Sequence, residues 1–194
     1  MVLISVIAGE LLFCAAVVLY IRNAFKSPEK PALGMWVLFS SATFLNVLSM
    51  FVHTSGESKA LSNMFSIVDF SACIVVVCAL TFSHVALRVE KFERKYFWGI
   101  PLIISFWIFT KDEFSANLLS QGLIVLGYFP TLHKIMKNGR NTEPFFPWGL
   151  NLAATLVSFY PAYAEHNILA EIYAWRSLIQ MSSLLLIMYM YKRN

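Results

Sequence analysis

The stretch "GLIVLGYFPTLHKIMKNGR" (residues 122–140) begins as an apolar run and turns basic within a few residues of its proline, Pro130. An apolar run that ends in Lys and Arg is typical of a membrane helix that ends at the cytoplasmic face. A proline inside such a helix removes one backbone N–H, and its ring clashes with the preceding turn. The stretch therefore predicts a kinked membrane-spanning helix with Pro130 as a hinge.

The composition of the whole chain agrees with a membrane protein. Of its 194 residues, 58% are hydrophobic and only 13% are charged, whereas soluble domains are about 25% charged, and the mean hydropathy is +0.65. A window of about 20 residues, the length that crosses a bilayer, finds seven apolar segments. They lie at residues 2–22, 32–54, 60–83, 96–111, 113–134, 145–164 and 168–191. The sequence thus predicts an all-α, polytopic membrane protein with seven transmembrane helices.

The basic residues predict how these helices are oriented. Every Lys and Arg except Lys59, Lys111 and Arg176 falls on alternate loops, on the same side as the C-terminus. Because positive charge collects on cytoplasmic loops, we expect the N-terminus outside and the C-terminus in the cytoplasm. The basic pI, about 9.0, then reflects topology and anionic lipid headgroups, and no nucleic-acid partner is expected.

Two segments of the chain follow a common plan, which predicts an internal repeat. "KSPEKPALGMWVLFSSATFLNVLSMF" (26–51) and "KNGRNTEPFFPWGLNLAATLVSFYPA" (137–162) each begin with a basic loop and a proline and enter the next helix at a tryptophan. One offset of 112 residues places Trp36 on Trp148 and Thr43 on Thr155. We expect three units: a first three-helix repeat (1–83), a basic loop with a linker helix (84–112) and a second three-helix repeat (113–194). Because a single linker helix separates the two three-helix repeats, both begin on the same side of the membrane. The repeats are then parallel and related by an axis along the membrane normal.

The segment "GYFPTLHK" (127–134) resembles the motif of the SWEET and PQ-loop superfamily of seven-helix transporters, which has an aromatic residue, then Pro-Gln, then a basic residue. In this chain Thr131 stands in the place of the glutamine. The chain is similar to a divergent member of that superfamily, which also includes the KDEL receptor. The resemblance implies a 3+1+3 arrangement and a small secondary transporter or facilitator.

Several polar residues fall at one depth in the predicted helices. Glu10, Asp69 and Arg176 each lie about eight residues from the outer end of their helix, which is roughly 12 Å at the helical rise. Asn46, Gln121 and Ser158 fall at a similar depth in three other helices. An ionisable group inside a membrane costs roughly 2.5–3.5 kcal/mol on insertion scales, so it suggests function.

This polar layer predicts a central cavity for solute and proton. Tyr173, Arg176 and Gln180 follow each other at helical spacing, which gives the last helix a polar stripe. In one interpretation Arg176 binds an anionic group, and Glu10, with no partner of its own, carries a proton. In the other, Arg176 pairs with Asp69 or Glu10 and locks the bundle. The other residues expected to line the cavity are Trp36, Trp148, Asn151, Ser158 and Tyr173.

Three functions remain open at this point. The first is a transporter that moves a small polar or charged solute by alternating access, with or without coupling to protons. The second is a receptor or sorting protein of the KDEL-receptor type, and the third is a structural subunit of a membrane complex. The chain could act alone or as a homodimer, in a bacterial inner membrane or in a eukaryotic endomembrane or plasma membrane.

No enzyme, metal or cofactor is expected. The four histidines lie at helix ends without the spacing of metal ligands. A retinal protein is excluded because its Schiff base needs a lysine in mid-membrane, whereas all lysines lie in loops or at helix ends.

Overall fold

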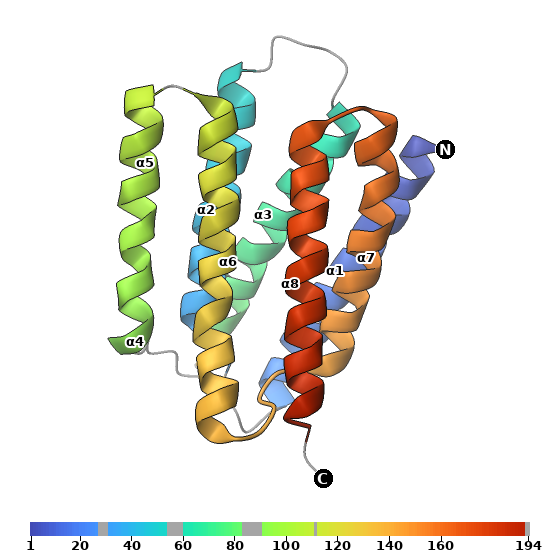
Figure 1. Ribbon diagram of the computed structural model, residues 1–194. Helices are drawn as coiled ribbons and strands as arrows, with labels where there is room; N and C mark the ends of the chain where they lie inside the picture. Colours follow the sequence, from blue (N-terminus) through green and yellow to red (C-terminus); the bar gives the residue numbers. More distant parts are fainter. Residues whose placement is uncertain (27–30, 54–59, 83–90, 111, 193–194) are drawn as a thin grey trace.

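The computed structural model describes residues 1–26, 31–53, 60–82, 91–110 and 112–192. This part of the chain is all-α (Figure 1). The helices are α1 (Val2–Lys26), α2 (Leu33–His53), α3 (Ala60–Phe82), the short α4 (Lys91–Arg94), a 3-10 turn (Lys95–Trp98), α5 (Gly99–Thr110), α6 (Glu113–Asn138), α7 (Phe145–Ala164) and α8 (Ile168–Met190). The expectation of an all-α fold is confirmed.

The long helices alternate in direction along the chain. In Figure 1, α1, α3, α6 and α8 run downward and α2, α5 and α7 run upward, so the two termini lie at opposite ends of the bundle. We call the end at which α1, α6 and α8 finish the basic end. The basic side chains described there are Arg22, Lys26, Arg94, Lys95, Lys134, Lys137, Arg140 and Lys192. Five other members of the charge pattern, Lys30, Lys59, Arg88, Lys111 and Arg193, lie outside the described residues.

All seven expected helices, the linker helix included, are found within four residues of the expected bounds. The linker helix was expected over 96–111, whereas α5 begins at Gly99 and a 3-10 turn precedes it. Among the described residues, α1 is the one helix long and apolar enough by itself to cross a membrane, and shorter apolar stretches cover 33–48 and 66–82.

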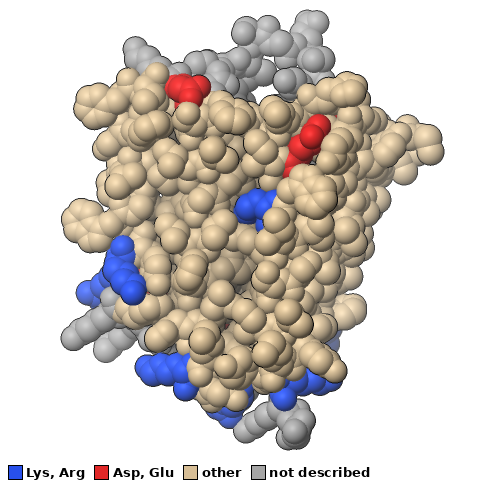
Figure 2. Space-filling model, in the orientation of Figure 1, with Lys and Arg blue, Asp and Glu red and all other residues tan. Residues whose placement is uncertain are grey.

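Large apolar side chains are exposed around the outside of the bundle. They include Ile4 and Leu11 on α1, Leu102 and Phe109 on α5, Leu118 and Phe129 on α6, Leu156 on α7, and Ile179 and Leu186 on α8. On the face drawn in Figure 2, most charged side chains lie toward the two ends, with Lys and Arg at the lower one. Soluble monomers rarely expose so continuous an apolar surface.

The helices of the two halves pack in matching pairs. α1 packs against α7, and α2 packs against α6. If α6, α7 and α8 are taken as the counterparts of α1, α2 and α3, the counterpart of the α1–α7 pair is the α6–α2 pair. The pairs α1–α3 and α2–α3 likewise become α6–α8 and α7–α8, which are also packed. α5 lies beside α6 at one edge (Figure 1).

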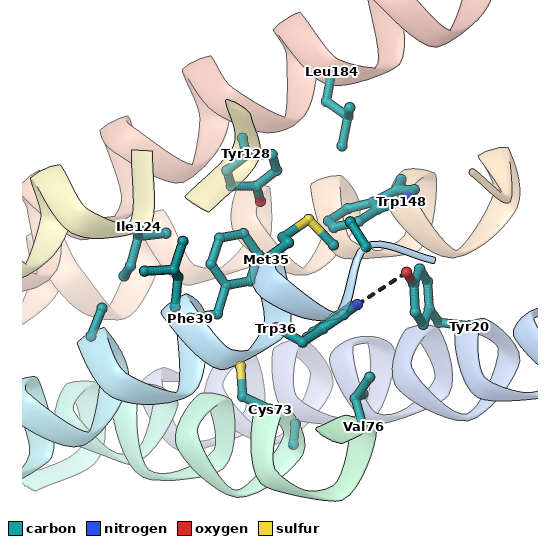
Figure 3. Packing of buried hydrophobic residues seen from close by; sticks show 14 of the residues in the cluster. Tyr20, Met35, Trp36, Phe39, Cys73, Val76, Ile124, Tyr128, Trp148 and Leu184 are labelled. Carbon is teal, nitrogen blue, oxygen red and sulfur yellow. Dashed lines mark hydrogen bonds between the residues drawn. The ribbon is translucent and has the colours of Figure 1, made fainter. Parts of the chain in front are cut away.

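The centre of the bundle at its basic end is a cluster of buried aromatic rings (Figure 3). Trp36 and Trp148 stack with their ring centroids 6.2 Å apart and their planes at 20°. The Tyr20 ring meets both tryptophans edge-on, and Phe39 packs between Trp36 and Tyr128. We refer to these five residues as the aromatic cluster.

Capping residues fix where α6 and α8 begin and where α6 ends. The Asp112 carboxylate accepts a hydrogen bond from the Ser115 amide at 3.1 Å, and Asn167 accepts one from Ala170 at 3.3 Å, which satisfies an otherwise unpaired N–H at each start. Gly139 ends α6 in the left-handed conformation, with φ of 64°, where a side chain would be strained. Between these ends α6 continues through Pro130.

Candidate functional site

Polar side chains from α3, α6 and α8 form one network of hydrogen bonds and a cation–π contact inside the bundle. Arg176 donates from Nε to Oε1 of Gln121 at 2.9 Å and from Nη1 to Oε1 of Gln180 at 2.7 Å. Its guanidinium also lies over the Tyr173 ring, 4.7 Å from the ring centroid. The Tyr173 hydroxyl in turn donates to Oδ2 of Asp69 at 3.0 Å. Tyr173 therefore connects the acidic residue to the basic one.

The ion pair that would lock the bundle is not formed in the described part of the chain. The hydrogen bonds of Arg176 go to the amides of Gln121 and Gln180 and not to a carboxylate. Two buried donor atoms of the network, Nη2 of Arg176 and Nε2 of Gln180, have no acceptor among the described residues. A buried guanidinium nitrogen without an acceptor is costly, so this arrangement favours the binding of an anionic group.

Glu10 of α1 lies near this network without joining it. Its carboxylate is close enough to Asp69 for the two charges to repel each other. Both of its oxygens are buried and have no hydrogen-bond partner among the described residues. Two carboxylates close together in a low dielectric do not both stay ionised at little cost.

A cavity of about 30 Å³ separates the network from the aromatic cluster. Asp69, Tyr173 and Arg176 contribute to its wall on one side, and Trp36 and Trp148 on the other. A smaller cavity of about 20 Å³ between α1 and α7 shares Trp36 and Trp148 with it. Since a water molecule needs roughly 10–15 Å³ by this measure, the larger cavity has room for about two waters in this conformation.

Most of the residues expected from the sequence are brought together here. Asp69, Gln121, Tyr173, Arg176 and Gln180 share the network, while Trp36, Trp148 and Asn151 line the cavity with Asp69, Tyr173 and Arg176. Glu10, Gln121 and Gln180 are not in the cavity wall, and neither are Asn46 and Ser158. Asn46 is buried in α2, and the Ser158 hydroxyl donates to the Thr155 carbonyl of its own helix at 2.7 Å.

Sequence reasoning missed several residues of the site. Asn117 accepts a hydrogen bond from Gln121, one helical turn away, and that spacing on one helix face could have identified it. Cys73, which shares the helical spacing of Asp69 along α3, lies 4.0 Å from Oδ1 of Asp69. Tyr20 and Glu143 could not have been found in this way, because they meet only through the packing of different segments.

Glu143 is a buried carboxylate in the connection between α6 and α7. It is 4% exposed, and Oε2 accepts a hydrogen bond from Nε1 of Trp148 at 3.4 Å. Burial raises the pKa of Glu143 to about 7, although Lys134 and the hydrogen bonds of Tyr20 and Trp148 act in the opposite direction. The loop that contains Glu143 therefore holds a group that titrates near neutral pH.

Among the described residues, no group of three or more His, Cys, Asp or Glu side chains is placed to hold a metal ion. No known protein-family model matches the chain, and no curated protein matches it.

Proposed function

We propose that this chain is a multi-pass membrane protein that moves a small polar or charged solute by alternating access around the central cavity. The observation that carries the proposal is the position of Arg176. It lies in the cavity wall, within a bundle whose outer surface is apolar, and its Nη2 has no acceptor among the described residues. Charged residues at such positions in membrane proteins commonly mark a substrate or ion pathway.

Several features support insertion in a membrane with the N-terminus outside. The exposed apolar side chains are distributed over most of the long helices, and the described basic side chains lie at the end where α1, α6 and α8 finish. We place this basic end at the cytoplasmic face. Single cysteines added at Asn138 and at Ser115, on the Cys14→Ser, Cys73→Ser, Cys78→Ser background, should react with an impermeant thiol reagent from the cytoplasmic and the outer face respectively. Labelling of both from one face would contradict the topology.

The chemistry of the network favours a solute that carries a negative charge or both charges. Arg176 and Gln180 offer donors, whereas Glu10 and Asp69 offer carboxylates to a cation or a proton. A plain sugar does not require a guanidinium and two acids in its site. The class of solute can be tested independently of the membrane topology.

The size of the cavity supports a change in conformation during each cycle. A cavity that has room for about two water molecules cannot admit a metabolite unless helices separate. The matched packing of α1 with α7 and of α2 with α6 supports a parallel repeat whose halves rock against each other. Pro130 in α6 is where we expect that helix to bend.

Uptake into proteoliposomes tests the transport activity. Radiolabelled alanine, glutamate, lysine and glucose would each be offered with and without an inward proton gradient, to the native chain and to Arg176→Gln. We expect uptake of a charged or zwitterionic solute that Arg176→Gln abolishes. Saturable binding of such a solute without flux would assign a receptor instead.

A further inference from the structure

The loop between α6 and α7 holds Glu143 in a fixed position. The Asn141 side chain accepts a hydrogen bond from the Glu143 amide at 3.0 Å and donates one to the Glu143 carbonyl at 2.8 Å. The Asn141 amide also donates to the Tyr191 carbonyl at 2.8 Å, which attaches the loop to the end of α8. The carboxylate therefore does not simply swing out into solvent.

Two donors from the aromatic cluster converge on this carboxylate. Nε1 of Trp148 donates to Oε2 at 3.4 Å, and the Tyr20 hydroxyl lies close enough to the carboxylate to lower its pKa. The same Tyr20 hydroxyl accepts a hydrogen bond from Nε1 of Trp36 at 3.0 Å (Figure 3). Both stacked tryptophans are thus connected to Glu143, one directly and one through Tyr20, whereas its Oε1 has no partner among the described residues.

The aromatic cluster lies between the cavity and the basic end of the bundle. Trp36 and Trp148 line the cavity, so separation of these two rings would open a path from the cavity toward the basic end. Their separation breaks the hydrogen bonds that converge on Glu143 and admits water to its carboxylate.

We propose that Glu143 is a proton-binding site and that its proton controls whether the cavity is closed at the basic end. The protonated carboxyl is neutral and can remain buried beneath the stacked tryptophans. The ionised carboxylate is better solvated by water, which reaches it when the cluster opens. Acidification therefore closes the basic end, and a rise in pH opens it.

The direction of this effect follows from linkage between protonation and conformation. Burial raises the pKa of Glu143 to about 7 in the closed structure, whereas its ordinary value is 4.5. The ionisable groups that face it, Lys134 on α6 and Tyr20 on α1, do not cancel the effect of burial. Because the closed state binds the proton more tightly than a hydrated open state does, protonation must favour closure.

The native cysteines offer a direct test. Cys73 is buried in the cavity wall, whereas Cys14 and Cys78 are exposed. In a Cys14→Ser, Cys78→Ser background reconstituted in nanodiscs, the labelling rate of Cys73 by a charged methanethiosulfonate reports the opening of the cavity. The rate would be measured at pH 6 and pH 8, with and without Glu143→Gln. At each pH the rate for the native Glu143 protein is divided by the rate for Glu143→Gln, which removes the intrinsic pH dependence of the thiol.

For a pKa of about 7, the ionised fraction rises from about one-tenth at pH 6 to nine-tenths at pH 8. We expect the quotient of native to Glu143→Gln rates to rise several-fold between these pH values, up to about ninefold. Tyr20→Phe, which keeps the ring and removes the hydroxyl, should speed labelling at pH 6. Glu171→Gln, in the first turn of α8 at the opposite end, should leave the pH dependence unchanged.

A quotient that is the same at both pH values would overturn the proposal, as would a Cys73 that is never labelled. If Glu143→Gln does not fold, the Tyr20→Phe rates decide in its place, and unchanged labelling at pH 6 counts against the proposal. The inference rests on the proposed opening of the cavity but not on solute flux. If the labelling depends on pH but no solute is taken up, the role of Glu143 is supported and transport is rejected. If solute is taken up but the labelling does not depend on pH, transport is supported and the role of Glu143 is rejected.

Discussion

Trp36 and Trp148 stack on each other at the centre of the bundle, with ring centroids 6.2 Å apart. These residues occupy equivalent positions in the two related segments, 112 residues apart in sequence. Equivalent residues of two halves come into contact where they lie beside the axis that relates them. The contact is what the proposed parallel repeat requires at its axis, which would pass through the aromatic cluster.

Removal of the Tyr173 hydroxyl should destabilise the protein. Tyr173→Phe keeps the ring under Arg176 but deprives Asp69 of its donor at 3.0 Å, which should cost about 1–3 kcal/mol of unfolding free energy. Thermal unfolding in detergent measures the loss. The control is Tyr163→Phe, because that hydroxyl only accepts a hydrogen bond from Trp175 at the surface. Equal shifts for both variants would show that the Asp69 contact has no special value.

Two glycines of α6 should respond in opposite ways to alanine. A Cβ on Gly127 would lie 2.6 Å from the Phe39 ring, whereas a Cβ on Gly122 would meet nothing within 4 Å. The Phe39 ring cannot easily move, because it packs between Trp36 and Tyr128. Gly127→Ala should therefore destabilise by about 1–3 kcal/mol.

Gly122→Ala should instead stabilise by up to about 1 kcal/mol, since alanine favours the helix. Melting temperatures of the two variants in the same detergent test the difference. If Gly127→Ala melted at or above the temperature of Gly122→Ala, the close approach of α2 and α6 would be contradicted.

Glu143 should make the stability of the protein depend on pH. Its folded-state pKa, about 7, lies above its ordinary value of 4.5, so between these values the folded protein holds a proton that the unfolded chain has released. The contribution of Glu143 to the free energy of unfolding should be greatest below pH 4.5. It should fall by an amount on the order of 3 kcal/mol as the pH rises toward 7 and stay level above that. Thermal unfolding of native and Glu143→Gln protein from pH 4.5 to 8 isolates this contribution. Parallel curves would show that Glu143 does not titrate in this range.

Replacement of Pro130 should stiffen α6. Pro130→Ala restores one backbone N–H within the helix, so we expect a higher melting temperature and slower labelling of Cys73 at pH 8. Pro147→Ala is the matched control, because Pro147 lies in the first turn of α7, where its missing N–H has no helical partner. A labelling rate that Pro130→Ala leaves unaltered would reduce Pro130 to a static kink.

Hydropathy predicted the long helices well because each apolar segment is bounded by charged or turn residues. Asp112 and Gly139, for example, cap α6 through local hydrogen bonding and backbone conformation. Hydropathy did not predict the 3-10 turn that precedes α5, since a 3-10 turn and an α-helix of the same composition have similar hydropathy.

The polar layer could be predicted in part for a similar reason. The depth of a residue follows from its distance to the helix end, so Asp69, Gln121 and Arg176 could be placed at one level. Depth does not define the direction in which a side chain points. Arg176 therefore binds Gln121 and Gln180 and not Asp69, and Ser158 donates within its own helix. The environment of Glu143 depends on contacts between α1, α6 and α7 that leave no pattern in the sequence.

If the charged cavity carries a solute across a membrane, the purified protein in proteoliposomes should take that solute up. The comparison is between the native chain, Arg176→Gln and Glu10→Gln, with alanine, glutamate, lysine and glucose as radiolabelled solutes. We expect uptake of at least one charged or zwitterionic solute by the native chain, its loss in Arg176→Gln and a changed pH profile in Glu10→Gln. Folded native protein that takes up none of these solutes, or that takes up glucose equally well with and without Arg176, would contradict the proposed transport.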